Sequence, residues 1–163
     1  MCDCLVCERI EQTRRGENPY LVRELETGYV VMGDIQRIPG YALFLCKRHA
    51  CELHELDPEY RRKFLWEMSL TAEAVYRAFQ PDKLNYELLG TGKGVHMHWH
   101  IFPRRAGDTP KPGPVWQLGA ELKDECFRPD DASLRALKCR LNAALDEVLA
   151  EADGQTGASV HRD

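Results

Sequence analysis

The feature that most constrains this chain is residues 96–104, where histidines alternate with large apolar side chains. Alternation with a period of two predicts a half-buried strand, because successive side chains point to opposite faces of a sheet. The apolar members, which we expect to face the core, are Met97, Trp99 and Ile101. The members expected on the other face, roughly 6–7 Å apart, are His96, His98 and His100.

Several imidazoles on one face indicate a chemical role, because imidazole suits proton transfer, nucleophilic attack and metal binding near neutral pH. One interpretation is a catalytic zinc ion held by the three rings. The other is a histidine nucleophile supported by its neighbours. A purely structural role is disfavoured, since three histidines in register are hard to place as core or surface residues. We favour the nucleophilic site.

The stretch resembles the signature of the histidine triad (HIT) superfamily of nucleotide hydrolases and transferases, which reads His-φ-His-φ-His-φ-φ, where φ is apolar. Every position matches, and the Pro103-Arg104 and Gly107-Asp108 that follow are similar to those of bacterial members. The resemblance covers roughly residues 4 to 105. It implies a HIT-like fold with a mostly antiparallel sheet and packed helices, assembled as a homodimer.

The local patterns also predict an α+β domain, with strands and helices in mixed order. A helix is expected over 57–79, because Asp57 is a good N-cap and Pro58 suits the first helical position. A second helix is expected over about 131–152, where leucines recur at helical spacing. Besides the histidine stretch, strands are expected over 21–25, 29–35, 41–46 and 84–89.

Residues 1–152 are expected to form a single domain, which is long enough to bury most of its apolar surface. Residues 153–163 are small and polar, so a disordered tail is expected there. The segment 104–120 is rich in proline and glycine and is expected to cross the surface. Trp116 in that segment is expected to be exposed or to cover the edge of a pocket.

The formal net charge of −4 argues against general binding of a nucleic-acid polymer. Positive residues near the histidines still suit a small anionic ligand. No apolar run approaches the length of a membrane span, and no signal-peptide core is apparent, so we expect a cytoplasmic protein without a membrane partner. The seven cysteines are therefore expected to be reduced thiols or metal ligands rather than disulfides.

Cys4 and Cys7 form a Cys-x-x-Cys pair at metal-ligand spacing. Several bacterial HIT branches open with such a pair and a short helix. The resemblance implies that the pair binds a structural zinc ion together with two histidines, which match His49 and His96 here. Cys2 is an alternative ligand, and thiols without a metal are the alternative interpretation. No organic cofactor is expected.

The resemblance also implies that the middle histidine, His98, is the nucleophile and forms a nucleotidyl-histidine at the α-phosphorus of a nucleotide. The attacking nitrogen must be unprotonated, so the other ring nitrogen of His98 is expected to donate its proton to a fixed acceptor. His100 is expected to hydrogen-bond the α-phosphate oxygens. His96 is expected to help fix the active face by a hydrogen bond or as the zinc ligand.

Other residues are expected to contact the substrate. Asp34 is the candidate for binding the ribose hydroxyls, a role that an acidic residue near the second strand has in the family. Lys93 and Gly94 lie in a glycine-rich loop whose backbone N–H groups can approach an anion, although Lys93 is equally a solvated loop lysine. Arg104 adds positive charge beside the histidines.

These features predict a hydrolase or transferase that releases a nucleoside monophosphate. Residues 84–90 are similar to bacterial members described as cleaving dinucleoside polyphosphates, so diadenosine tetraphosphate is the first expected substrate. The open alternatives are a nucleoside phosphoramidase and a zinc-stabilised nucleotide-binding protein without significant catalysis.

Tyr41 departs from the common pattern of the family, because family members often have histidine at that position.

Overall fold

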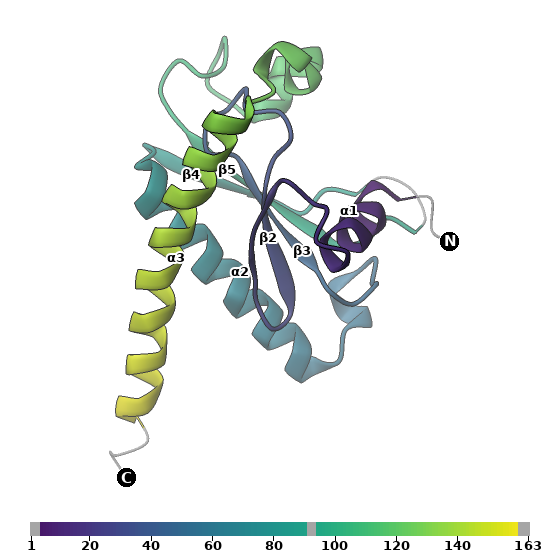
Figure 1. Cartoon of the computed structure of the whole chain (residues 1–163), viewed down its shortest axis with the longest axis vertical. Coiled ribbons are helices and arrows are strands. Elements are labelled where there is room, and N and C mark those ends of the chain that lie inside the picture. The colour runs from purple at the N-terminus through teal and green to yellow at the C-terminus, as the bar shows by residue number, and fades with distance from the viewer. Residues whose placement is uncertain (1–3, 91–93, 160–163) are drawn as a thin grey trace.

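The computed structural model describes residues 4–90 and 94–159 (Figure 1). Its strands form one antiparallel sheet in the order β1-β2-β3-β5-β4. The strands are β1 (Leu21–Glu24), β2 (Gly28–Met32), β3 (Ala42–Cys46), β4 (Lys83–Glu87) and β5 (His98–Arg104). The helices are α1 (Leu5–Arg14), α2 (Pro58–Phe79) and α3 (Asp131–Ser159).

One face of the sheet is covered by α2, and α3 packs against α2 and β1 (Figure 1). Phe44 of β3 stacks on Phe64 of α2, with ring centroids 5.1 Å apart. Side chains of β5 alternate as predicted: Met97, just before the strand, and Ile101 are buried in this core, and Trp99 packs against it. The histidines therefore project from the opposite face of the sheet.

The histidine face is covered in two places. Toward the start of β5 it lies under α1, whose residues share a cavity with Leu43 and Leu45 of β3. Toward the other end it lies under the 3₁₀ segment η2 (Val115–Lys123), which is kinked at Gly119. A second, smaller core holds η2 in place, and its buried members are Ile38, Phe102, Val115 and Leu118.

The predicted α+β architecture is confirmed, with shifts at the ends of elements. The strand expected over 29–35 ends at Met32. The Gly33 N–H still bonds the carbonyl of Tyr41, the next residue in register, at 2.9 Å, but the Gly33 carbonyl accepts from the Gln36 side chain instead of from a strand. The strand expected over 96–104 begins at His98, since the Met97 N–H bonds the Ala50 carbonyl at 2.8 Å instead of a neighbouring strand.

The expectation of a tail from residue 153 is wrong for its first part, because α3 continues to Ser159. No proline follows Pro129, so the sequence contains no strong stop after residue 152. Across the described parts of the chain, every helix is too short or too polar to cross a lipid bilayer.

A buried carboxylate anchors the β1–β2 turn to α2. Glu67 accepts hydrogen bonds from the backbone N–H of Glu26 at 3.1 Å and of Thr27 at 2.8 Å, and also from the Thr27 hydroxyl. Charge-assisted bonds of this kind satisfy donors that would otherwise be buried without partners. Glu67 therefore links the first hairpin of the sheet to the helix that packs beneath it.

Replacing this carboxylate is expected to destabilise the protein. Glu67→Ala leaves the buried N–H groups of the turn without their acceptor, and the free energy of unfolding is expected to fall by about 2–4 kcal/mol. The measurement is urea denaturation. The control is Glu73→Ala on the same helix, which removes an exposed partner of Arg77 and is expected to have a far smaller effect. Equal losses in the two variants would contradict the role assigned to Glu67.

Candidate active site

His98 is the first residue of β5 and lies opposite Leu45 of β3. Its Nδ1 is 2.8 Å from the backbone carbonyl oxygen of His96. A carbonyl oxygen can only accept a hydrogen bond, so Nδ1 carries the ring proton and donates it. The Nε2 atom of a neutral His98 then keeps a free lone pair. This is the arrangement that nucleophilic attack by His98 requires.

His100 lies next to His98 on the same face, with ring centroids 4.7 Å apart in an edge-to-face arrangement. Its Nδ1 is 2.5 Å from the hydroxyl oxygen of Tyr41. The Tyr41 ring stacks on Phe102 at a centroid distance of 4.1 Å. Trp116, which is partly exposed, meets the His100 ring edge-to-face at 5.9 Å. Trp116 is thus exposed and also contacts His100, where the sequence left exposure and the edge of a pocket as alternatives.

Burial controls the protonation of these rings. It lowers the pKa of His98 below its usual value, opposed by the hydrogen bond to the His96 carbonyl. It lowers the pKa of His100 to about 4, with a further contribution from His98. Both imidazoles are therefore neutral at neutral pH. Burial raises the pKa of the Tyr41 hydroxyl far above its usual value, and the negative charges of Asp34 and Glu87 add to this.

A cavity of about 240 Å³ lies against His98 and His100. Its floor is mainly apolar, from β2 and β3, and α1 forms one wall. An apolar cavity with a few placed polar groups is typical of a small-molecule site. The polar groups include Arg9 of α1 and Asp34, which form an ion pair with each other.

A second cavity, of about 130 Å³, is also lined by His98. Its lining includes Cys51, Glu52 and Gly90 together with His96 and His98. His98 therefore lines both cavities, so a molecule bound across this strand end would pass its ring.

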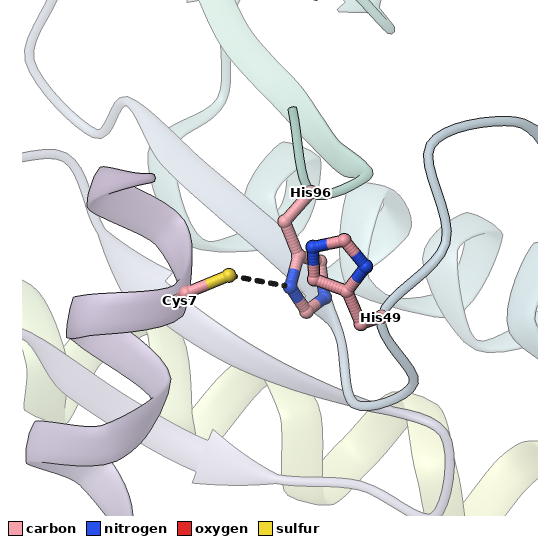
Figure 2. Close-up of side chains that lie close together, drawn as sticks. All are labelled: Cys7, His49 and His96. Atoms are coloured by element: carbon pink, nitrogen blue, oxygen red, sulfur yellow. Dashed lines mark hydrogen bonds between the residues drawn. The ribbon is translucent and has the colours of Figure 1, made fainter. Parts of the chain in front are cut away.

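A second cluster lies at the N-terminal end of α1. Figure 2 shows Cys7 of α1 pointing toward the rings of His49 and His96. One ligand atom from each of the three lies within 4.8 Å of the others. The Nε2 of His96 is 2.6 Å from the Cys46 carbonyl oxygen, to which it donates, and its Nδ1 faces the Cys7 sulfur at 3.4 Å. The Nδ1 atom of His96 therefore has a lone pair that could coordinate a metal ion.

The donor set of this cluster fits zinc. Sulfur and imidazole nitrogen are the usual ligands of structural zinc, and a backbone carbonyl often orients the ring of a ligating histidine. Cys4 lines the same cavity as Cys7, His49 and His96, but its sulfur lies outside the group of mutually close ligand atoms. Burial would raise the pKa of the Cys4 thiol, but backbone hydrogen bonds, led by that with His96, outweigh it and lower the pKa. Cys2 lies outside the described residues.

Comparison with known proteins identifies the family. The HIT domain model matches residues 19–107. The chain belongs to the HIT domain family. No curated protein matches the chain significantly.

Solved structures of HIT proteins share the fold. A histidine triad protein from Bradyrhizobium japonicum is 25% identical with a TM-score of 0.67, covering 82% of this chain and 95% of its own. One from Marinobacter aquaeolei VT8 is 25% identical with a TM-score of 0.66, covering 78% and 89%. A zinc-bound histidine triad family protein from Mycobacterium smegmatis is 22% identical with a TM-score of 0.61, covering 91% and 97%.

In this HIT protein, the residues expected to contact substrate lie in different surroundings. Asp34 lines the larger cavity. Gly94 has a φ of +84°, a conformation that glycine adopts without strain, and Lys93 lies outside the described residues. Arg104 is on the histidine face but is buried at the far end of β5.

The guanidinium of Arg104 is occupied by protein acceptors. It bonds both carboxylate oxygens of Asp108, at 2.7 and 2.8 Å, the Asn85 side chain at 2.6 Å and the Gly113 carbonyl at 2.9 Å. Arg104 does not line either cavity beside His98. In the structure these bonds hold the loop after β5, and a contact of Arg104 with substrate stays a prediction.

Sequence reasoning missed two partners in the site, namely Tyr41 for His100 and Arg9 for Asp34. Each pair is distant in sequence, by 59 and 25 residues respectively. The departure at Tyr41 from the histidine common in the HIT family was a usable signal for the first pair. Nothing in the local pattern of α1 distinguishes Arg9 from its other charged residues.

The burial of His100 predicts a loss of stability in acid. Its pKa is about 4 in the folded protein and about 6.5 when exposed. The unfolded chain therefore binds the proton first as the pH falls below about 6.5, and stability declines progressively toward about pH 4. Urea denaturation across this range should show a weaker pH dependence in His100→Asn than in the unmodified protein. Identical pH dependence in the two would contradict this expectation.

Proposed function

We propose that this HIT protein is a nucleotide hydrolase or transferase in which Nε2 of His98 attacks the α-phosphorus of its substrate. The observation that carries the proposal is the 2.8 Å hydrogen bond between His98 Nδ1 and the His96 carbonyl. It orients a neutral ring with its lone pair free, beside a cavity that fits a small molecule. Membership of the HIT family supports a nucleotide as the ligand.

The reaction proceeds by two displacements. In the first, a bond forms between His98 Nε2 and the α-phosphorus, while the bond from phosphorus to the leaving group breaks and its electron pair goes to the leaving group. In the second, water attacks the same phosphorus, the phosphorus–nitrogen bond breaks with its electron pair returning to Nε2, and the nucleoside monophosphate and a proton are released. Where another acceptor attacks in place of water, the nucleotidyl group is transferred to that acceptor. Covalent catalysis replaces one difficult displacement with two easier ones.

The neighbouring groups stabilise charge on the phosphoryl oxygens. We expect His100 to hydrogen-bond these oxygens, and the contact of its ring with that of His98 supports this role. The backbone near Gly94 and the side chain of Lys93 are proposed as further contacts to the anion. His96 contributes by its carbonyl oxygen, which accepts the hydrogen bond from the Nδ1–H group of His98.

The two cavities support dinucleoside polyphosphates as the substrate class. We assign the nucleoside to the 240 Å³ cavity, where Asp34 would exchange its bond with Arg9 for bonds to the ribose hydroxyls. The remainder of the substrate would leave past His98 into the 130 Å³ cavity. Comparing the hydrolysis of diadenosine tetraphosphate with that of an adenosine phosphoramidate distinguishes this class from the phosphoramidase alternative.

Removing the nucleophile provides the test. His98→Ala is expected to fold and to bind nucleotide within a few-fold of the unmodified protein, but to lose turnover by several orders of magnitude. The control is His54→Ala, which removes an exposed histidine that lines neither cavity beside His98. Substantial turnover in His98→Ala would rule out covalent catalysis by this residue, and loss of nucleotide binding in both variants would point to misfolding.

We also propose a structural zinc ion bound by Cys4, Cys7, His49 and His96. The mutually close ligand atoms of the last three support it, and the zinc-bound relative from Mycobacterium smegmatis is consistent with it. When bound, zinc would add folding free energy by linking α1 to the residues before β5. The attack by His98 does not need a metal.

Loss of a ligand is expected to lower both zinc content and thermal stability. Cys7→Ser and Cys4→Ser should reduce the zinc measured per chain and lower Tm by several degrees, since about 1 kcal/mol shifts Tm by about 2–4 °C. Cys139→Ser, at an exposed position on α3, is the control. Unchanged zinc content in both ligand variants would exclude the site. Chelation that abolishes turnover without unfolding would instead favour a catalytic zinc on the histidine triad.

We also propose that two copies of this chain associate as a homodimer. The edge strand β4 exposes Tyr86, and Leu89 just beyond it is also exposed. Exposed apolar side chains beside an unpaired strand edge favour contact with a second chain.

A further inference from the structure

His98 and His100 are held by hydrogen-bond partners of opposite character. The partner of His98 Nδ1 is a backbone carbonyl oxygen, which can only accept. The partner of His100 Nδ1 is the hydroxyl of Tyr41, which can donate as well as accept. The two contacts therefore need not select the same ring tautomer.

The surroundings of Tyr41 favour donation by its hydroxyl. His100 Nδ1 is the hydrogen-bond partner of this hydroxyl within the described parts of the chain. If Nδ1 carried the proton instead, the O–H group of Tyr41, which is only partly exposed, would have no acceptor among the described residues, and an unpaired donor there costs free energy. The tautomer of His100 with a bare Nδ1 and a proton on Nε2 satisfies both groups.

We propose that Tyr41 is a positioning residue, whose hydroxyl donates to His100 Nδ1 and so directs an Nε2–H donor at the phosphoryl oxygens of the substrate. This inference rests on the proposed function, because the donor is useful only if an anion binds beside His98. The two neighbouring imidazoles then have complementary tautomers: Nε2 of His98 attacks, and Nε2–H of His100 stabilises the charge that develops.

Tyr41 is held in place by its neighbours in the loop between β2 and β3. The side-chain amide of Gln36 donates to the carbonyl oxygens of Gly33 at 2.7 Å and Tyr41 at 2.9 Å, and its oxygen accepts from the Gly40 N–H at 2.9 Å. Stacking on Phe102 fixes the plane of the ring. A hydroxyl on a rigid ring can impose one tautomer on its partner.

Gly33 makes room for this ring. A Cβ atom at position 33 would lie 2.1 Å from one ring carbon of Tyr41 and 2.3 Å from the next. Any larger residue therefore requires the Tyr41 ring to move away from its present position. Gly33→Ala is thus a second way to disturb the contact with His100, and it retains the hydroxyl.

Burial keeps the proton on the Tyr41 hydroxyl, because it raises the pKa of this group far above its usual value. The hydroxyl therefore keeps its proton near neutral pH and is able to donate it in a hydrogen bond. The direction of the hydrogen bond itself is inferred from the need of the Tyr41 O–H group for an acceptor.

The direct test measures the tautomer of His100 by correlation of imidazole ¹⁵N and ¹H resonances, assigned by comparison with His100→Asn. The unmodified protein is expected to show His100 protonated on Nε2, and Tyr41→Phe to show a mixture or a shift to Nδ1. Protonation on Nδ1 in the unmodified protein, or the same tautomer in Tyr41→Phe, would overturn the proposal. The measurement needs no substrate, so it stands even if the proposed function fails.

The matched control is Tyr60→Phe, which removes a tyrosine hydroxyl that bonds the Thr27 carbonyl at 2.8 Å rather than a histidine ring. It should leave the His100 tautomer unchanged. If Tyr41→Phe does not fold, Gly33→Ala replaces it, with the same expected change at His100. An unchanged tautomer in Gly33→Ala would count against the proposal.

With a nucleotide substrate, Tyr41→Phe is expected to lower kcat by about 10–100-fold, because misplacing a catalytic group can cost this much. KM is expected to change by much less, since the oriented donor acts mainly on charge that develops in the transition state. An unchanged kcat, or a rise in KM alone, would contradict positioning by Tyr41. If the unmodified protein does not turn over any nucleotide substrate, that result would instead count against the proposed function.

Discussion

The hydrogen bond from His98 Nδ1 to the carbonyl of His96 is the constraint on which the site depends. It requires the chain at His96 to turn its carbonyl toward the next histidine rather than toward β3. Two contacts hold that conformation: the Met97 N–H bonds the Ala50 carbonyl, and the His96 ring donates to the Cys46 carbonyl. The start of β5 therefore acts as a support that orients the ring of His98, the proposed nucleophile.

His96 connects two parts of the molecule with different chemistry. Its backbone carbonyl orients His98, while its ring lies in the cluster with Cys7 and His49 (Figure 2). The helix that carries Cys7 also carries Arg9, which pairs with Asp34 at the wall of the larger cavity. A metal in the cluster would thus stabilise both the support of the nucleophile and one wall of the proposed nucleoside site, without contacting the reacting atoms.

Local patterns were sufficient for much of the fold and for the identity of the histidine face. The alternation in 96–104 placed Met97 and Ile101 in the core, and the N-cap Asp57 correctly marked the start of α2. Local patterns could not predict which side chains from separate segments of the chain contact one another. The charge of Arg104 did not reveal its engagement by Asp108, and the pairing of Tyr41 with His100 depends on the register of β3 against β5. The length of α3 was also missed, because its last turns contain small residues but no proline.

The most direct measurement of the central claim is rapid quenching of the protein during turnover of a nucleotide labelled at its α-phosphorus, followed by mapping of the labelled peptide. Covalent attack predicts a nucleotide attached to His98 through an acid-labile, alkali-stable phosphorus–nitrogen bond, formed and lost at rates compatible with kcat. Turnover without any such adduct, or an adduct on a different residue, would contradict attack by His98.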